Sequence, residues 1–303
     1  MQKNNLKHYL HLHFLVFIAG FTAILGEAIS ISEVISLSSI ALVWHRMLIA
    51  LVITFLFLLY YRYNLKIKLK DFFKFSLAGI IIALHWITFF EAIEQSNISI
   101  TLAMFSTGAF FASLIEPIFF KRKVRPVEII LGFIVICGVF IILQANISSF
   151  IGVLLGIISA LLASLFSVLN GKLVQDNNPF LISFYEFLSG VTFILLYLTF
   201  SANLIDLNIE SFFSYDYLYV FILGSICTAY AFIASIHILK FLSPYTLVLT
   251  YNLEPVYGIL LAIFIFPETE KMEFSFYIGT LIIISTIIIN SILKIKNTKK
   301  VSS

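Results

Sequence analysis

Charged residues are scarce in this sequence of 303 residues. Asp, Glu, Lys and Arg together make up 12% of it, whereas 61% is apolar. Soluble domains are about a quarter charged and about half apolar, so a water-facing surface could not cover this many apolar side chains. The composition excludes an ordinary soluble domain and predicts an all-α integral membrane protein, whose apolar side chains face lipid.

Cysteine and reactive sequence signatures are also sparse. The two cysteines, Cys137 and Cys227, lie in apolar stretches, which favours buried thiols over a disulfide framework or a zinc site. The sequence has no glycine-rich phosphate loop ending in Gly-Lys-Ser/Thr and no Gly-x-Ser-x-Gly turn, which argues against ATP hydrolysis and acyl transfer. We expect no catalytic residue, no cofactor, no metal ion and no nucleic acid partner. An intramembrane enzyme acting on lipid is kept as an alternative function.

Long apolar stretches fill most of the chain. An α-helix needs about 20 mainly apolar residues to cross the hydrocarbon core, and ten stretches meet this length, joined by mostly short loops. They cover residues 10–29, 37–59, 72–92, 98–120, 127–145, 150–169, 180–200, 217–239, 244–266 and 274–293. We predict ten transmembrane helices, the first of which is retained because no small-residue cleavage site follows it.

The basic residues alternate between loops in a way that predicts orientation. If the N-terminus is cytoplasmic, 17 of the 19 Lys and Arg residues fall on the inner side, Lys271 falls outside, and Arg46 lies within a span. Basic loops are held in the cytoplasm, so we place the protein in the cell inner membrane with both termini cytoplasmic. The lipid bilayer is its first partner, and a homodimer is compatible with the sequence.

A weak internal repeat divides the chain. A shift of 147 residues aligns spans four and five with spans nine and ten without a gap, and it superposes Gly132 on Gly279 and Thr107 on Glu254. A rival shift of 138 superposes Glu116 on Glu254 but needs a gap. Five spans per half is an odd number, so the second half must insert upside down, as in many secondary transporters. We predict two inverted five-helix repeats, residues 1–147 and 148–303.

These features resemble the drug/metabolite transporter superfamily, EamA type. The resemblance covers almost the whole chain and is carried by diffuse small-residue and proline patterns at residues 239–244, 253–256 and 267–268, with a counterpart at 92–97 followed by Gly132 and Gly138. The chain departs from the family in the basic turn 121–125, where an acidic Gly-Glu type turn is common. The resemblance implies export of amino acids or related small metabolites. Some relatives instead carry lipid-linked sugars or nucleotide sugars.

Two ionisable residues near mid-span are the leading candidates for binding a small organic solute. An ionisable group in the middle of a bilayer costs on the order of 3 kcal/mol, so Arg46 in span two and Glu254 in span nine require an explanation. In a central cavity, Arg46 would bind a substrate carboxylate, and Glu254 would bind an amine or take up a proton. The competing interpretation is a structural ion pair between them. Pro255 is expected to kink span nine beside Glu254.

Further polar and aromatic residues are candidates for the same cavity. His85 could relay protons and Trp86 could stack on substrate, although a buried histidine is often a structural hydrogen-bond partner. The other mid-span candidates are Thr107, Tyr230, Tyr251 and Asn252, each of which could equally hold helices together. On a helix, His45 points about 100° away from Arg46, and we expect Arg46 to face the cavity.

Acidic and histidine residues near the span ends are interpreted structurally. We expect Glu116 to pair with the basic turn 121–125 and His8, His11 and His13 to be solvated at the inner interface. Glu186 is less easily explained, because it occupies in span seven the position that Arg46 roughly occupies in span two.

Overall fold

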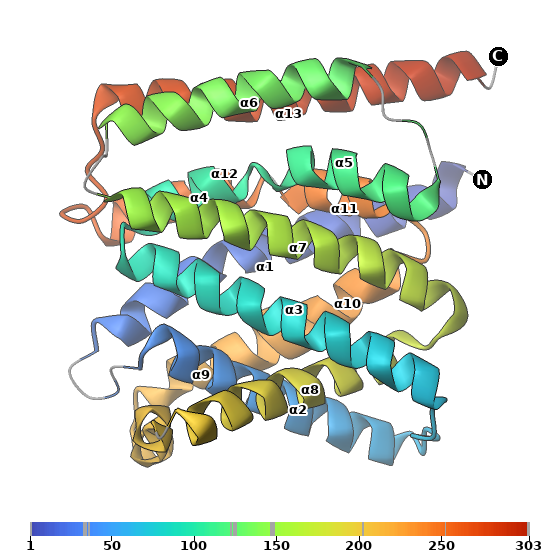
Figure 1. Cartoon of the computed structure of the whole chain (residues 1–303), viewed down its shortest axis with the longest axis vertical. Coiled ribbons are helices and arrows are strands. Elements are labelled where there is room, and N and C mark those ends of the chain that lie inside the picture. The colour runs from blue at the N-terminus through green and yellow to red at the C-terminus, as the bar shows by residue number, and fades with distance from the viewer. Residues whose placement is uncertain are drawn as a thin grey trace.

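The computed structural model describes residues 2–32, 35, 37–121, 123, 126–145, 149–201, 203–251 and 253–301. Figure 1 shows a bundle of helices, and the described residues contain no β-strand. The α-helices are α1 (Gln2–Ser30), α2 (Ser39–Tyr60), α3 (Leu69–Glu94), α4 (Ile98–Phe105), α5 (Gly108–Phe120), α6 (Pro126–Ala145), α7 (Phe150–Asp176), α8 (Pro179–Phe200), α9 (Tyr217–Gly224), α10 (Ala231–Ile238), α11 (Pro244–Tyr251), α12 (Glu254–Ile265) and α13 (Phe274–Val301). Two 3₁₀ segments, η2 (Leu204–Leu207) and η3 (Ile209–Phe213), precede α9, and one π-helical turn, η4 (Ser225–Tyr230), joins α9 to α10.

Eight helical segments are long and apolar enough to cross a membrane, and each coincides with a predicted span. The fifth and tenth predicted spans contain the shorter apolar segments Ile130–Ile142 in α6 and Phe274–Thr286 in α13, as far as the described residues extend. The multi-pass helical prediction is therefore confirmed, whereas the count of ten spans is not. The start of α1 and the end of α13 lie on the same side of the bundle (Figure 1), as an even number of crossings requires.

Polar caps mark where several spans begin. Ser38 accepts a hydrogen bond from the backbone N–H of Ala41 at the start of α2, with 3.3 Å between the two atoms. Asn97 does the same for Ile100 at the start of α4, at 2.9 Å. These side chains satisfy backbone donors that have no partner within the helix. Local sequence thus fixes the helix starts, while hydropathy fixes their lengths.

Large apolar side chains cover the outside of the bundle. Leu56 on α2 is 58% exposed, Phe133 on α6 is 65% exposed and Leu281 on α13 is 65% exposed. Apolar surface on this scale is stable against lipid but not against water. The exposed belt therefore supports the membrane assignment that the composition predicted.

The helices form a main bundle with one pair set apart. In the bundle, α3 packs against both α7 and α8, and α2 packs against α8. Helices α6 and α13 pack chiefly on each other and form their own layer at the top of Figure 1. At their contact, a Cβ on Gly138 would lie 3.0 Å from the Gly279 carbonyl oxygen, and one on Gly279 would lie 2.7 Å from the Gly138 oxygen. The facing pair is thus Gly138 and Gly279, whereas the gapless alignment had matched Gly132 with Gly279; Gly132 packs on Phe110 instead.

Spans four and nine are both interrupted at mid-span. Span four consists of α4 and α5, and span nine consists of α11 and α12, with breaks after Phe105 and after Tyr251. The two breaks are offset by 146 residues, one residue from the predicted shift of 147. The half-helices contact crosswise, α4 with α12 and α5 with α11. Two discontinuous helices at matching positions expose backbone groups in the middle of the bundle.

Each interrupted span is capped by a carboxylate from the other one. Glu270, just beyond α12, accepts hydrogen bonds from the backbone N–H groups of Ile98 and Ser99 at the start of α4, both at 2.9 Å. Glu116, on α5, accepts one from the backbone N–H of Tyr245 at the start of α11, at 2.7 Å. We had expected Glu116 to pair with the basic turn 121–125, of which residues 122, 124 and 125 lie outside the described residues. The reciprocal caps link the two halves of the chain at both ends of these spans.

Candidate solute-binding cavity

A cavity of about 150 Å³ lies at the centre of the bundle, beside the two helix breaks. A cavity of about this volume in another protein holds a benzene molecule. Its lining comes from α1 to α5, α7, the η4–α10 segment, α11 and α12. We had predicted lining from spans one to four and six to nine, but no residue of α8, which is span seven, lines it. Six aromatic residues contribute to its wall: Trp86, Phe89, Phe105, Phe166, Phe232 and Tyr251.

Arg46 supplies a buried cation to this cavity. Its side chain is 1% exposed, its Nε donates to Thr228 Oγ1 at 2.9 Å, and its guanidinium carbon lies 4.2 Å from the ring centroid of Trp86. Nη1, by contrast, is buried and has no hydrogen-bond partner among the described residues. Stacking on Trp86 and the hydrogen bond to Thr228 therefore fix the plane of the guanidinium group and leave the Nη1 donor without a partner. An unpaired charged donor in such a place is suited to a carboxylate.

Glu254 brings the opposite charge to the same cavity. It is 5% exposed, and it begins α12 immediately after the break in span nine. The charges of Arg46 and Glu254 act on one another electrostatically. The ion pair that we had considered between them is nevertheless absent, because the described residues contain a single salt bridge, between Lys74 and Asp71. The cavity is thus lined by a guanidinium group and a carboxyl group that form no direct ion pair.

His85 is partly committed to structure. Its Nδ1 lies 3.0 Å from the carbonyl oxygen of Ser159 and 2.8 Å from the Ser159 hydroxyl oxygen. A carbonyl can only accept, so Nδ1 carries the hydrogen and Nε2 is left as an acceptor. His85 lines the cavity and stacks on Phe105 with ring centroids 5.5 Å apart. The residue therefore ties α3 to α7 and offers one acceptor to a solute.

Tyr251 is held at the edge of the aromatic wall. Its hydroxyl group lies 2.8 Å from the Ser235 hydroxyl oxygen, which fixes the ring between α11 and α10. On the facing side, Phe166 and Phe232 stack with centroids 5.2 Å apart. Aromatic rings that are braced in this way give an apolar group a rigid surface to pack on.

The remaining predicted residues lie outside the cavity or outside the described residues. Tyr230 is 44% exposed and contacts His11, with 2.9 Å between its hydroxyl oxygen and Nε2. Thr107 donates to the Met104 carbonyl within span four. Pro255 is the second residue of α12, directly after the point where α11 ends, and the predicted kink in span nine stays a prediction. Asn252 lies outside the described residues.

His45 does not face the cavity, in agreement with the helical-wheel argument. Its Nε2 lies 2.7 Å from the Leu207 carbonyl oxygen and its Nδ1 lies 3.0 Å from the Tyr217 hydroxyl oxygen. The two neighbouring residues therefore serve different parts of the molecule. His45 fixes the segment that leads into α9, and Arg46 faces the cavity.

Comparison with known proteins identifies this architecture. The sequence profile of the EamA-like transporter family matches residues 7–144 and again residues 150–292. The chain belongs to the EamA-like transporter family. It is therefore a membrane transporter of the drug/metabolite transporter superfamily with a two-repeat architecture, as the resemblance implied.

Other comparisons add the fold and no substrate. One solved structure, described as the crystal structure of a protein, matches this EamA-like chain with a TM-score of 0.65 and 15% sequence identity. The match covers 95% of this chain and 98% of that chain, and at this identity it shows the fold alone. No protein of curated function matches the chain.

Small residues on α7 of this EamA-like transporter form a part of the wall that the sequence analysis missed. Ala160, Ala163, Ser164 and Ser167 line the cavity at helical spacing. The Ser164 hydroxyl lies 2.8 Å from the Gly108 carbonyl oxygen, beside the break in span four. The recurrence of small residues every three to four positions is a readable signal of a close-packed helix face.

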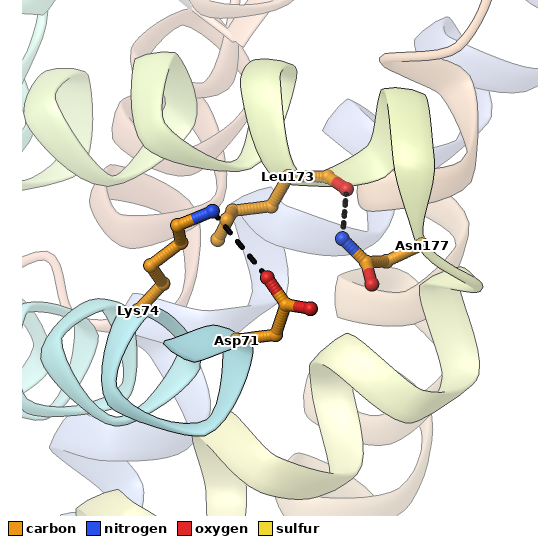
Figure 2. A network of polar contacts seen from close by, with 4 residues as sticks. All are labelled: Asp71, Lys74, Leu173 and Asn177. Carbon is orange, nitrogen blue, oxygen red and sulfur yellow. Dashed lines mark hydrogen bonds and ion pairs between the residues drawn. The ribbon is translucent and has the colours of Figure 1, made fainter. Parts of the chain in front are cut away.

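A second, wider pocket of about 980 Å³ opens at one end of the bundle, where α2 connects to α3 and α7 connects to α8. We call it the basic mouth, after the lysines that line it: Lys66, Lys68, Lys70, Lys74 and Lys172. Figure 2 shows two of its contacts, the ion pair between Lys74 Nζ and Asp71 Oδ1 at 3.3 Å and the bond that Asn177 Nδ2 donates to the Leu173 carbonyl at 2.9 Å. This end carries a positive field that attracts anionic solutes.

Proposed function

We propose that this transporter exports α-amino acids or closely related small zwitterions with an apolar side chain. The observation that carries the proposal is the guanidinium and carboxyl pair of the cavity, in which Arg46 Nη1 has no partner and forms no ion pair with Glu254. A zwitterion supplies a carboxylate for Arg46 and an ammonium group for Glu254. Its apolar part packs on the aromatic wall around Trp86 and Phe232.

Electrostatics favours a solute of this class. A bound zwitterion adds no net charge to a cavity that already contains one cation and one potential anion, so both ends are paired at once. Each charge-assisted hydrogen bond contributes about 1.5–3 kcal/mol. A solute with only one of the two charged ends would leave the other protein group buried and unpaired, which disfavours its binding.

The reciprocal caps support transport by alternating access. We place the basic mouth on the cytoplasmic side, with both termini, in the inner membrane. Glu116 then links spans four and nine near the cytoplasm, and Glu270 links them near the outside. Releasing one cap while keeping the other would open the central cavity to one side at a time, which is what inverted repeats provide.

Lipid-linked sugars and nucleotide sugars are less well supported as cargo. Their phosphate groups require several cationic side chains, and Arg46 is the single cationic residue in the described lining of the cavity. The volume of about 150 Å³ is also small for such cargo. These compounds are retained as competitors in the experiment.

Counterflow in proteoliposomes tests the proposal. Vesicles containing the purified protein are loaded with unlabelled amino acid, and uptake of the labelled compound is compared with protein-free vesicles. We expect exchange of apolar amino acids, at least tenfold weaker competition by their carboxyl amides and by carboxylic acids without the amine, and no requirement for ATP. Exchange of a nucleotide sugar with no effect of amino acids would overturn the proposal.

Glu254→Gln separates two roles of that residue. If Glu254 binds the solute ammonium group, the variant should weaken exchange at every pH. If Glu254 instead takes up a transported proton, exchange should persist and only its pH dependence should disappear.

A further inference from the structure

The most heavily buried carboxyl group of the bundle is not in the cavity. Glu186 on α8 is 0% exposed, and neither of its carboxyl oxygens has a hydrogen-bond partner among the described residues. It lines neither the central cavity nor the basic mouth. The mechanism described above therefore makes no use of it.

Other buried polar groups lie next to this carboxyl without satisfying it. Asn170 on α7 is 0% exposed, and its side-chain amide is close enough to act as a hydrogen-bond donor to Glu186, although neither Oδ1 nor Nδ2 meets full hydrogen-bond geometry with a described residue. Ser183, one turn before Glu186 on α8, is also fully buried with an unpartnered hydroxyl. A structural carboxyl is normally hydrogen-bonded, because an unsatisfied buried polar group destabilises the fold. This cluster is therefore unexplained by packing.

The cluster lies between the two pockets. Ser167, which is one turn from Asn170 on α7, lines the central cavity and has an unpartnered hydroxyl. Leu169 and Leu173, on either side of Asn170, line the basic mouth. Glu186 itself lies about 10 Å along α8 from the end that faces that mouth. Ser167 and Asn170 thus place two polar side chains, one helical turn apart on α7, between the cavity and Glu186.

No opposite charge compensates Glu186. Helix α8 packs against α2, α3, α7, α10 and η2. The ionisable residues on these elements are His45, Arg46, Lys70, Asp71, Lys74, His85, Glu91, Glu94, Lys172, Asp176, Asp206 and His237. None of them acts on Glu186 as a charge; the one side chain that affects its carboxyl is the Asn170 amide, as a hydrogen-bond donor. On α3 the neighbouring surface is bare backbone, because a Cβ on Gly79 would lie 2.8 Å from the Glu186 Cα atom. An ionised carboxylate is costly in such a place, so Glu186 carries a proton in this conformation.

We propose that Glu186, with Asn170 and Ser183, is a proton-binding site that couples solute export to the proton gradient. The inference rests on the proposed function and adds its energy source. When the basic mouth opens and water enters between α7 and α8, the carboxyl O–H bond breaks, the carboxylate keeps the electron pair and the proton passes to water. A proton fits this site better than a metal ion does, because a metal ion needs several oxygen ligands around an open position.

Coupling follows from the difference between the two protonation states. The protonated carboxyl is compatible with the closely packed arrangement of α3 and α8. The carboxylate requires the arrangement in which water has entered between α7 and α8. A proton that enters through the outward-open cavity therefore favours closure of the cytoplasmic side, and its release to the cytoplasm favours opening. Solute that then binds between Arg46 and Glu254 supplies the free energy for closing the unprotonated carrier, so the solute leaves as the next proton enters. A ligand shifts a conformational equilibrium only by its differential affinity for the two states. Here the ligand is the proton, which binds Glu186 more tightly in the closely packed state than in the hydrated state.

The test compares exchange with gradient-driven transport in proteoliposomes. Glu186→Gln keeps the shape of the side chain but cannot release a proton. We expect counterflow at equal pH to stay within about twofold of the parent protein, while accumulation driven by a pH gradient is lost. Asp176→Asn, the same change at an exposed residue of the basic mouth, should leave both unchanged. Glu186→Asp should recover part of the pH-driven accumulation.

Several outcomes would overturn the inference. They are pH-driven accumulation by Glu186→Gln at the parental level, a parent protein that exchanges solute but never responds to a pH gradient, and accumulation driven by sodium instead. A parent protein that exchanges no amino acid contradicts the proposed function, and the proton site is then judged without transport. In the infrared spectrum, the band of protonated carboxyl groups should weaken in Glu186→Gln and not in Asp176→Asn; an unchanged band would reject the site.

Discussion

Arg46 and Glu186 lie at similar positions along the second predicted span of each half of the chain and have opposite surroundings. Each is the eighth residue of its helix, α2 or α8, and both are buried, at 1% and 0% exposure. Arg46 stacks on Trp86, bonds to Thr228 and faces the cavity. Glu186 has no bonding partner and faces no pocket described here.

The difference teaches that pseudo-symmetry preserves a position without preserving its environment. In an inverted repeat, one of the two positions lies nearer the outside and the other lies nearer the cytoplasm. Partners around Arg46 keep its guanidinium plane fixed for recognition. Glu186 has few polar partners, so its affinity for a proton depends on whether water reaches it. Its protonation state is therefore what differs between the two conformations in the proposed mechanism.

Arg46→Ala should give the largest effect on transport. Losing the carboxylate contact removes about 1.5–3 kcal/mol of binding, which corresponds to roughly 10- to 100-fold weaker exchange. Arg46→Lys should recover little, because an ammonium group cannot form the forked contact or the same stacking. Counterflow of an apolar amino acid measures both variants. Full transport of carboxylate solutes by Arg46→Ala would show that the proposed contact is wrong.

Glu186→Met and Thr228→Val should change stability in opposite directions. Methionine removes two unsatisfied oxygens, so we expect the free energy of unfolding to rise by about 1–3 kcal/mol. Valine at position 228 leaves Arg46 Nε without its acceptor and should lower that free energy by about 1–2 kcal/mol. Thermal unfolding in detergent measures both. If Glu186→Met is the less stable variant, the Glu186 carboxyl is stabilised by hydrogen bonds in the folded protein, and the contact with Asn170 is then structural.

Removing the Glu270 cap should have a moderate effect. Glu270→Ala leaves the N–H groups of Ile98 and Ser99 unsatisfied, which should cost about 1–2 kcal/mol. Glu270→Gln keeps one acceptor oxygen and should cost less than the alanine variant. Amide exchange at the start of α4 reports the loss locally, with the start of α11, capped by Glu116, as the internal control. Equal protection in all three proteins would mean that the cap contributes nothing.

Tyr251→Phe should give the smallest effect. The ring and its packing are kept, and only the contact with Ser235 is lost, which is worth about 1 kcal/mol or less than tenfold in exchange. Tyr251→Ala, which removes the ring, is the matched comparison and should reduce exchange further. A Phe variant as impaired as the Ala variant would indicate that the hydroxyl group itself contacts the solute.

Sequence alone was sufficient for the spans and for part of the site. Apolar length located the eight confirmed spans within a few residues, because a bilayer imposes that length on any crossing helix. The cost of burying charge singled out Arg46 and Glu254, and the structure brings both into the cavity together with His85, Trp86 and Tyr251. Both inferences depend on properties of a single segment, namely its apolar length and the cost of burying a charge in it.

The rest depends on how the helices are rotated, which hydropathy does not report. A span that is apolar all round has no strong polar face to mark the side that packs inward. Tyr230 therefore seemed as good a candidate as Tyr251, yet it points away from the cavity. The cap that Glu116 provides for the start of α11 was not predicted, because the two lie 129 residues apart in sequence. The break in span four has no proline to announce it.

The π-helical turn η4 (Ser225–Tyr230) changes the direction in which the side chains of span eight point on its two sides. A π turn contains one more residue than an α turn. Because each residue turns a helix by about 100°, the side chains of α10 point about this angle away from where a continuous α-helix would place them. Thr228 sits in this turn, donates to the Leu223 carbonyl at 2.6 Å and still accepts from Arg46. Deleting a single residue here would restore a regular helix and turn the α10 lining away from the solute. The number of residues in this span is therefore more tightly constrained than the identity of most of its side chains.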